Sequence, residues 1–407
     1  MSKDVKPTAA YPSIEALKPY VTGKPIEELA REKGLAHITK LASNENPLGA
    51  SAKALEVIRA TNLETLSRYP DGGGFTLKTA IAQYHAKETD LNLNQITLGN
   101  GSNDLLDLIA RTFVASNQAV VMSEFAFAVY PIVTAAIGAT AQIAAAKDYG
   151  HDLGAMLAQI TEATRLVFIA NPNNPTGTLL SQDEIHRFLT KVAPHIVVVL
   201  DEAYTEYKGD FGSGSETSLS WLSEFDNLII TRTFSKAFGL AAMRVGYALS
   251  SSSLADLINR LRHPFNVSTL SQLAATAALS DREFLQASAD LNLSERKRLE
   301  QVLDNWQIAY LPSAANFVTL KVPENLYGGD GAKLYEALLN LGVIARPLGG
   351  YGMGEWLRVS IGLPEENDHF IRALRALMGL EPEESSDAGL GGWQQAGADV
   401  IAAQSDS

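Results

Sequence analysis

The sequence lacks cysteine, an excess of basic residues and any long apolar run. Without cysteine the chain has no disulfide, thiol nucleophile or zinc–thiolate site, which fits a reducing compartment. The 33 Lys and Arg residues against 46 Asp and Glu residues give a net charge of −13, which disfavours nonspecific binding to nucleic acid. No apolar run approaches the roughly 18 residues of a membrane span, and the first residues have no signal-peptide core. We therefore expect a cytoplasmic globular protein that binds neither nucleic acid nor membranes.

Three near-continuous apolar runs share one arrangement, in which polar side chains follow directly. The run 166–169 is followed by Asn174, the run 196–200 by Asp201, and the run 228–230 by Lys236. Such runs suit strands covered on both faces, as in a parallel sheet. In an open α/β sheet the ligand crevice lies beyond the carboxyl ends of the strands. We therefore expect these three side chains to converge on one site.

The periodicity of apolar residues predicts the other helices and strands. Expected helices cover residues 13–17, 51–60, 104–113, 181–191, 293–306, 333–341 and 365–378. Expected strands cover residues 95–98, 119–122, 166–169, 196–200, 228–230, 317–320, 342–346 and 355–361. From about residue 285 onward the pattern is that of a smaller α/β domain. The tail from Glu381 has no Lys or Arg and is rich in Glu, Ser, Gly and Ala, so we expect it to be disordered.

Lys236 stands between Ser235 and a small apolar run, at the expected end of a buried strand. Most lysines are solvated surface charges, and that reading applies here too if the lysine is considered alone. A buried lysine instead has a lowered pKa, because burial disfavours the charged form. Its neutral amine can then react with the aldehyde of a cofactor. This interpretation requires the rest of the chain to supply an aldehyde-binding site.

A pyridoxal phosphate site needs an amine, a carboxylate for the ring nitrogen, donors for the ring oxygen and an anion site for the phosphate. Lys236 supplies the amine and Asp201 the carboxylate, and the remaining parts fall to Tyr204, Asn174, Ser102, Ser235 and Arg244. The Gly99–Asn103 turn leads into a helix, whose N-terminus can bind an anion. Each feature also has an ordinary explanation, such as a turn, a strand-end cap or a surface ion pair. Their combination at three consecutive strand ends is what indicates the cofactor. The seven histidines lack metal-ligand spacing, so we predict no metal site.

The motifs at these strand ends resemble the signature of the fold-type I, class II aminotransferases. The motifs are Asn174-Pro175-Thr176-Gly177, Asp201-Glu202-Ala203-Tyr204, and Ser235-Lys236 followed by Arg244. Other segments are similar to the histidinol-phosphate aminotransferases within that group. They are residues 40–49, 68–71, 264–267 and 345–348, and Leu357-Arg358-Val359-Ser360-Ile361-Gly362. The similarity runs from about residue 14 to residue 379.

The resemblance implies a fold-type I pyridoxal-phosphate transferase, with a mostly parallel central sheet in a large domain and a smaller α/β C-terminal domain. The implied parts are a flexible arm at 1–13, a segment at 14–48 packing with the small domain, a large domain at 49–285, a small domain at 286–379, and the tail at 380–407.

The resemblance also assigns roles in the cofactor site. Lys236 would hold the cofactor and carry the proton, Asp201 would pair with the ring nitrogen, and Tyr204 and Asn174 would contact the ring oxygen. Phe127 would stack on the ring, where many relatives have tyrosine. The phosphate would be bound by Gly101, Ser102, Asn103, Thr233, Ser235 and Arg244, and by Tyr69 from the neighbouring subunit of a homodimer.

The guanidinium of Arg358 can bind a carboxylate or a phosphate through two parallel hydrogen bonds. Since one site must accept both glutamate and a phosphate ester, a second cation is useful. Arg346 lies twelve residues earlier on a neighbouring expected strand. It fits this role, although an arginine there could also be a surface residue. Tyr20 and Asn44 are the other expected substrate contacts.

The implied reaction is amino transfer from L-glutamate to imidazole acetol phosphate, giving L-histidinol phosphate and 2-oxoglutarate in histidine biosynthesis. Alternatives on the same fold are an aromatic amino-acid aminotransferase and a threonine-phosphate decarboxylase. A non-catalytic regulator built on such a domain would carry an added DNA-binding module, and the arm before Ser13 is too short for one.

Overall fold

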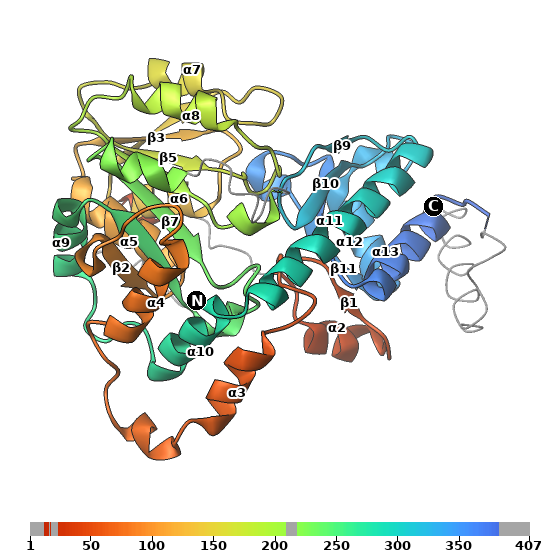
Figure 1. Ribbon diagram of the computed structural model, residues 1–407. Helices are drawn as coiled ribbons and strands as arrows, with labels where there is room; N and C mark the ends of the chain where they lie inside the picture. The colour runs from red at the N-terminus through yellow and green to blue at the C-terminus, as the bar shows by residue number, and fades with distance from the viewer. Residues whose placement is uncertain (1–11, 16, 18–22, 209–217, 382–407) are drawn as a thin grey trace, which may run out of the picture.

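The computed structural model describes residues 12–15, 17, 23–208 and 218–381. Its centre is a seven-stranded sheet in the order β2-β8-β7-β6-β5-β3-β4 (Figure 1). The strands are β2 (Ile96–Gly99), β3 (Ala119–Ser123), β4 (Thr140–Ala144), β5 (Thr164–Ala170), β6 (Val197–Asp201), β7 (Leu228–Thr233) and β8 (Gly246–Ser250). Strands β4, β3, β5, β6 and β7 pair in parallel, and β8 runs antiparallel to both its neighbours. The predicted fold class, α/β with a mostly parallel central sheet, is confirmed.

Helices cover both faces of this sheet, which explains the continuous apolar runs. Along β5, Leu166 and Phe168 belong to the core formed with α5 and α6, while Val167 and Ile169 belong to the opposite core formed with α8. Alternate strand residues point to opposite faces, so both sets must be apolar. The helices of this part are α3 (Ala52–Ala60), α4 (Phe75–His85), α5 (Ser102–Phe113), α6 (Val129–Ala136), α7 (Leu153–Ala158), α8 (Gln182–Leu189), α9 (Ser252–Leu261) and α10 (Thr269–Leu279).

A second, antiparallel sheet has the strand order β12-β13-β10-β9 and its own apolar core. Its strands are β9 (Tyr310–Leu311), β10 (Phe317–Lys321), β12 (Arg346–Pro347) and β13 (Trp356–Ser360), and the helices of this part are α11 (Arg282–Asn305), α12 (Gly331–Asn340) and α13 (Pro364–Leu377). Near the N-terminus lie α1 (Pro12–Glu15), α2 (Ile26–Lys33) and β1 (Thr39–Lys40), and β1 pairs in parallel with β11 (Val343–Ile344). In Figure 1, α2 and β1 lie beside the helices of this smaller sheet.

The single strand expected at 342–346 is wrong. Val343 and Ile344 pair with β1, whereas Arg346 and Pro347 pair with β13, and the buried Ala345 separates the two strands. The chain changes pairing partner at this point, which a continuous apolar pattern does not reveal.

The helix expected at 293–306 is also wrong at its start, because α11 begins at Arg282. Asp281 caps it by accepting a hydrogen bond from the Phe284 N–H. The inward positions of the added turns include Ser288 and Asn292, which are buried but polar. These residues interrupt the apolar periodicity on which the prediction relied. The domain boundary expected at 285/286 falls inside α11, and we propose the same two domains with this helix common to both.

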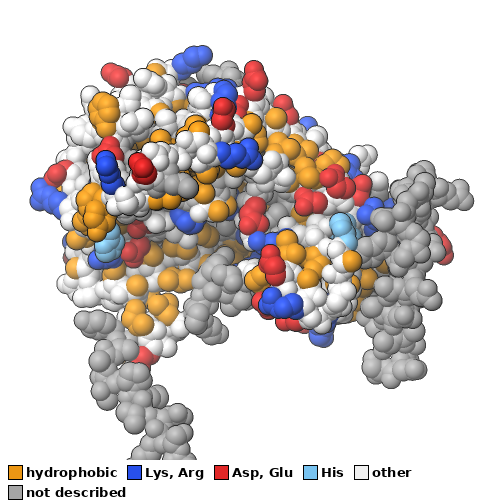
Figure 2. All heavy atoms as spheres, turned by 90° about the horizontal axis from the view of Figure 1, so that it is seen from below, with side chains coloured by type: hydrophobic (Ala, Val, Ile, Leu, Met, Phe, Trp, Pro, Cys, Tyr) orange, Lys and Arg blue, Asp and Glu red, His pale blue; other side chains and the backbone are white. Residues whose placement is uncertain are grey.

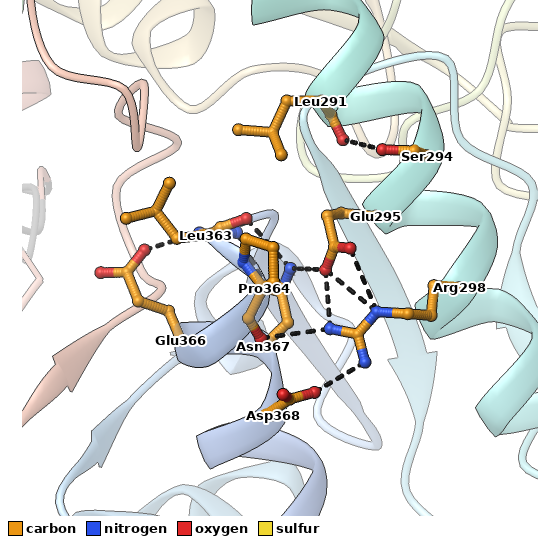
Figure 3. Close-up of polar contacts among 10 residues, drawn as sticks. Leu291, Ser294, Glu295, Arg298, Leu363, Pro364, Glu366, Asn367 and Asp368 are labelled. Atoms are coloured by element: carbon orange, nitrogen blue, oxygen red, sulfur yellow. Dashed lines mark hydrogen bonds and ion pairs between the residues drawn. The ribbon is translucent and has the colours of Figure 1, made fainter.

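Helices α11 and α13 are joined by a polar cluster, the α11–α13 junction, formed by Glu295, Arg298, Asn367 and Asp368 (Figure 3). Arg298 pairs with both acids, at 2.7 Å from Glu295 and 2.7 Å from Asp368. The buried Asn367 side chain donates to Glu295 and bonds the N–H and carbonyl of Gly362. The junction therefore fixes the turn that directly follows β13.

Within the described ranges, no helix is long and apolar enough to cross a membrane. Basic and acidic side chains are interspersed over the face seen in Figure 2. Most of the arm predicted at 1–13 and most of the tail predicted at 380–407 lie outside the described residues.

Candidate active site

Most of the predicted site residues line one cavity of about 460 Å³ beyond the carboxyl ends of β5, β6 and β7. They are Asn44, Ser102, Asn103, Phe127, Asn174, Asp201, Tyr204, Thr233, Ser235, Lys236, Arg244, Arg346 and Arg358. Asp201 ends β6 and Thr233 ends β7, and these two strands are parallel neighbours. Asn174, Asp201 and Lys236 come together as expected because adjacent parallel strands end at the same edge of the sheet.

The Lys236 amine is held at the cavity by a hydrogen bond to the carbonyl oxygen of Ser43, at 3.2 Å. The pKa of Lys236 is lowered to about 8, mainly by burial and in part by the nearby positive charge of Arg358. Roughly a tenth of this amine is therefore neutral at pH 7, far more than for an ordinary lysine, and this fraction can act as a nucleophile or a base.

The Asp201 carboxylate is buried and accepts two side-chain hydrogen bonds. The Tyr130 hydroxyl donates to Oδ2 at 2.9 Å, and the Thr231 hydroxyl donates to Oδ1 at 3.1 Å. Burial raises the pKa of Asp201 to about 6, and these hydrogen bonds oppose the rise. Asp201 therefore remains largely ionised at neutral pH and is aimed by its neighbours.

Tyr130 and Thr231 were missed by the sequence analysis. Thr231 lies opposite Asp201 in the β6–β7 register, so the expected pairing of these strands is a signal that could have found it. Tyr130 comes from α6 and stacks on Phe168, with ring centroids 4.5 Å apart. Nothing in its local sequence indicates this contact.

The Tyr204 hydroxyl oxygen receives two amide donors. Asn44 Nδ2 lies 3.0 Å away and Asn174 Nδ2 lies 3.2 Å away. Burial raises the pKa of Tyr204 to about 12, so the hydroxyl keeps its proton over the physiological range.

The anion-binding end is built around the first turn of α5 and Arg244. Gly101 precedes α5 with a φ of 82°, and a Cβ added there would lie 2.4 Å from Arg244 Nη2. Glycine is therefore required for the guanidinium to approach the helix N-terminus. Arg244 Nη1 also donates to Ser235 Oγ at 3.2 Å. Free N–H groups, the helix dipole and a guanidinium together favour a phosphate.

Arg346 and Arg358 lie directly opposite each other in the β12–β13 register, and both line the cavity. Arg358 is 5% exposed, and its guanidinium donates to the Ala42 carbonyl at 2.8 Å and to Asn174 Oδ1. The sequence spacing of these arginines therefore corresponds to a cross-strand pair.

Two predicted residues that the structure describes, Gly101 and Tyr69, are not among those lining the cavity. Gly101 packs closely against the Arg244 guanidinium. Tyr69 is 82% exposed and stacks on Phe265, with ring centroids 4.6 Å apart. Tyr20 lies outside the described residues.

The functional groups that line the cavity match those that a pyridoxal phosphate site requires. The cavity offers an amine of lowered pKa, an aimed carboxylate, a tyrosine hydroxyl and the half-buried Phe127 ring. It also offers an anion site in which a Cβ at Gly101 would collide with the Arg244 guanidinium. Together with the α/β sheet, these features define a fold-type I, pyridoxal-phosphate-dependent transferase.

The chain belongs to the class I and II aminotransferase family, whose model matches residues 36–374. It is 53% identical over 367 residues to "Histidinol-phosphate aminotransferase 2" of Pseudomonas aeruginosa, covering 90% of this chain and 96% of the relative. It is 49% identical over 369 residues to "Histidinol-phosphate aminotransferase 1" of Idiomarina loihiensis, covering 90% and 97%. A crystal structure of histidinol-phosphate aminotransferase from Sinorhizobium meliloti in complex with pyridoxal-5'-phosphate superposes with a TM-score of 0.78 at 27% identity, covering 91% of this chain and 98% of that one.

Proposed function

We propose that this protein is a histidinol-phosphate aminotransferase. It transfers the amino group of L-glutamate to imidazole acetol phosphate, reversibly giving L-histidinol phosphate and 2-oxoglutarate in L-histidine biosynthesis in the cytoplasm. Relatives of that name at about half identity over nearly the whole chain support the reaction class. The observation that carries the substrate assignment is the cross-strand pair Arg346 and Arg358 in the cavity.

Bound pyridoxal phosphate supplies an aldehyde that captures amines and a ring that accepts electron density. Lys236 holds the cofactor, and its amine then takes the proton from the substrate Cα and returns it during the transfer. Asp201, aimed by Tyr130 and Thr231, would supply the negative charge that keeps the ring nitrogen protonated. Tyr204 and Asn174 would hold the ring oxygen, and Phe127 would pack against the ring.

The phosphate of the cofactor is held at the α5 N-terminus by Ser102, Asn103, Thr233, Ser235 and Arg244, with Gly101 leaving room for the guanidinium. The protein acts as a homodimer, in which the exposed Tyr69 of one protomer reaches the phosphate in its partner. The exposed apolar side chains of Leu66, Phe75 and Phe265 support such an interface.

Two guanidinium groups suit substrates that carry either a carboxylate or a phosphate dianion, since both anions accept paired N–H donors. Asn44 and Tyr20 complete the substrate contacts. The carboxylate of an aromatic keto acid carries a single negative charge, whereas a phosphate monoester carries up to two. The aromatic keto acid therefore gains less from the second arginine. A threonine-phosphate decarboxylase would lose carbon dioxide and consume no glutamate.

The test compares imidazole acetol phosphate and phenylpyruvate as amino acceptors from L-glutamate, by kcat/KM. The wild type should prefer the phosphorylated acceptor. Arg346→Gln should lower kcat/KM for that acceptor by about 100-fold while changing phenylpyruvate turnover by less than about fivefold. A wild-type preference for phenylpyruvate would refute the assignment, and carbon dioxide release from threonine phosphate would favour the decarboxylase.

A further inference from the structure

Two parallel chains of hydrogen bonds connect β13 to the Tyr204 hydroxyl. In one, Arg358 Nη1 donates to Asn174 Oδ1, and Asn174 Nδ2 donates to Tyr204. In the other, Ser360 Oγ donates to Asn44 Oδ1 at 2.9 Å, and Asn44 Nδ2 donates to Tyr204 at 3.0 Å. Arg358 and Ser360 are two residues apart on one strand, so they lie on the same face of the sheet. Each orients one asparagine amide.

The two amide donors determine what the Tyr204 hydroxyl can do. A tyrosine hydroxyl has one proton to donate and two acceptor positions. Asn44 and Asn174 together account for both acceptor positions. The hydroxyl proton is thereby left for another acceptor, and Tyr204 lines the cavity. Tyr204 is held as a donor toward whatever occupies that space.

Ser360 fixes the orientation of the Asn44 amide from outside the cavity lining. Its Oγ accepts a hydrogen bond from the Asn44 backbone N–H at 2.9 Å as well as donating to Oδ1, and the serine is 3% exposed. Asn44 has a φ of 55°, a left-handed conformation that surrounding contacts must hold. Because Oδ1 faces the serine hydroxyl, Nδ2 must face Tyr204.

We propose that Ser360 is a positioning residue that acts through Asn44 to keep Tyr204 a hydrogen-bond donor in the cofactor site. Because Ser360 lies on β13, the ability of Tyr204 to donate its proton then depends on the position of that strand. This inference rests on the proposed function in that the acceptor of the Tyr204 proton is the ring oxygen of pyridoxal phosphate.

The test uses a matched pair of serines that hold the same segment, residues 41–46. Ser288 is also 3% exposed, and its hydroxyl accepts from Asn46 Nδ2 at 2.8 Å, but it makes no contact with Asn44 or Tyr204 in the described hydrogen-bond network. Ser360→Ala and Ser288→Ala therefore remove equivalent buried hydroxyls from the segment. Ser360→Thr restores the hydroxyl.

Two readouts need no substrate: the affinity of the apoenzyme for pyridoxal phosphate, and the pH at which the absorbance of the bound cofactor changes. Ser360→Ala should weaken the affinity by roughly three- to tenfold and move the absorbance midpoint by roughly half a unit. Ser288→Ala should leave that midpoint in place, and Ser360→Thr should return it toward the wild-type value. A wild-type midpoint in Ser360→Ala, or an equal shift in Ser288→Ala, overturns the proposal.

The Tyr204→Phe background checks the route of the effect. If Ser360 acts through Tyr204, adding Ser360→Ala to Tyr204→Phe produces no further shift, and a persisting shift overturns the proposal. Asn44→Asp is the second variant should Ser360→Ala fold poorly. It replaces the amide donor with an acceptor that draws the tyrosine proton away, so its shift should exceed that of Ser360→Ala, and no shift overturns the proposal. Failure of the wild type to bind pyridoxal phosphate would instead refute the proposed function.

Discussion

The active-site cavity and the α11–α13 junction both gather charged side chains, but they balance charge differently. At the junction, Arg298 is matched by Glu295 and Asp368 (Figure 3). Among the described residues, the cavity is lined by four cationic side chains and one carboxylate, Asp201. The cations are Lys236, Arg244, Arg346 and Arg358. The junction is therefore complete within the protein, whereas the cavity is arranged for an anionic ligand.

The two regions therefore have opposite effects on the stability of the fold. Like charges gathered in a partly buried cavity repel each other, so the site lowers stability in return for binding. A matched polar cluster between helices contributes to stability and touches no ligand. Substitutions in the cavity should therefore mainly change activity, and substitutions at the junction should mainly change stability.

Replacement of the cavity amine should produce the largest effect. Lys236→Ala removes both the cofactor attachment and the proton carrier, so we expect kcat to fall by at least about 1,000-fold. The melting temperature of the apoenzyme should stay the same or rise, because one of the gathered cations is gone. Steady-state kinetics and thermal melts of the apoenzyme measure the two outcomes. A marked loss of stability would contradict the contrast between the regions.

Asn367→Ala should have the converse effect at the junction. It leaves the N–H and carbonyl of Gly362 without their side-chain partner in a buried place, so the free energy of unfolding should fall by about 2 kcal/mol. The kcat of the folded enzyme should change by less than about threefold. Urea unfolding and kinetics at the same temperature provide the measurement.

The matched control for this substitution is Arg260→Ala, which breaks an exposed helix pair with Asp256. It should change the free energy of unfolding by less than about 0.5 kcal/mol. Equal effects of the two variants would show that the junction is no more than a surface cluster.

The pH dependence of cofactor capture should show the smallest effect. The neutral Lys236 amine reacts, so the rate at which apoenzyme captures pyridoxal phosphate should rise with pH and level off above the lysine pKa of about 8. Since the positive charge of Arg358 lowers this pKa, Arg358→Gln should move the midpoint to higher pH. Arg298→Ala at the junction should leave it unchanged. A midpoint near the ordinary lysine pKa of 10.5 in the wild type would contradict the cavity electrostatics.

The sequence predicted the parts of the site that follow a local rule. Asp201 comes directly after an apolar run, Asn174 and Lys236 come a few residues after theirs, and parallel strands bring such positions together. Arg346 and Arg358 came from the family resemblance and their spacing, and they prove to be cross-strand neighbours.

The parts that were missed depend on contacts between segments remote in sequence. Tyr130 reaches Asp201 across 71 positions, and Ser360 reaches Asn44 across 316. No periodicity or motif encodes such pairs. The start of α11 was missed for another reason, because Ser288 and Asn292 are polar residues at buried positions of the helix.

The 41–46 segment has a consequence for biosynthesis. It is made early, yet its partners include Asn316, Ile344, Arg358 and Ser360, which emerge from the ribosome about 300 residues later. The growing polypeptide must therefore carry this segment without its final neighbours until those residues have been made, and contacts between such distant positions form slowly. The 41–46 segment can therefore take its final place only after residues 316–360 have been made.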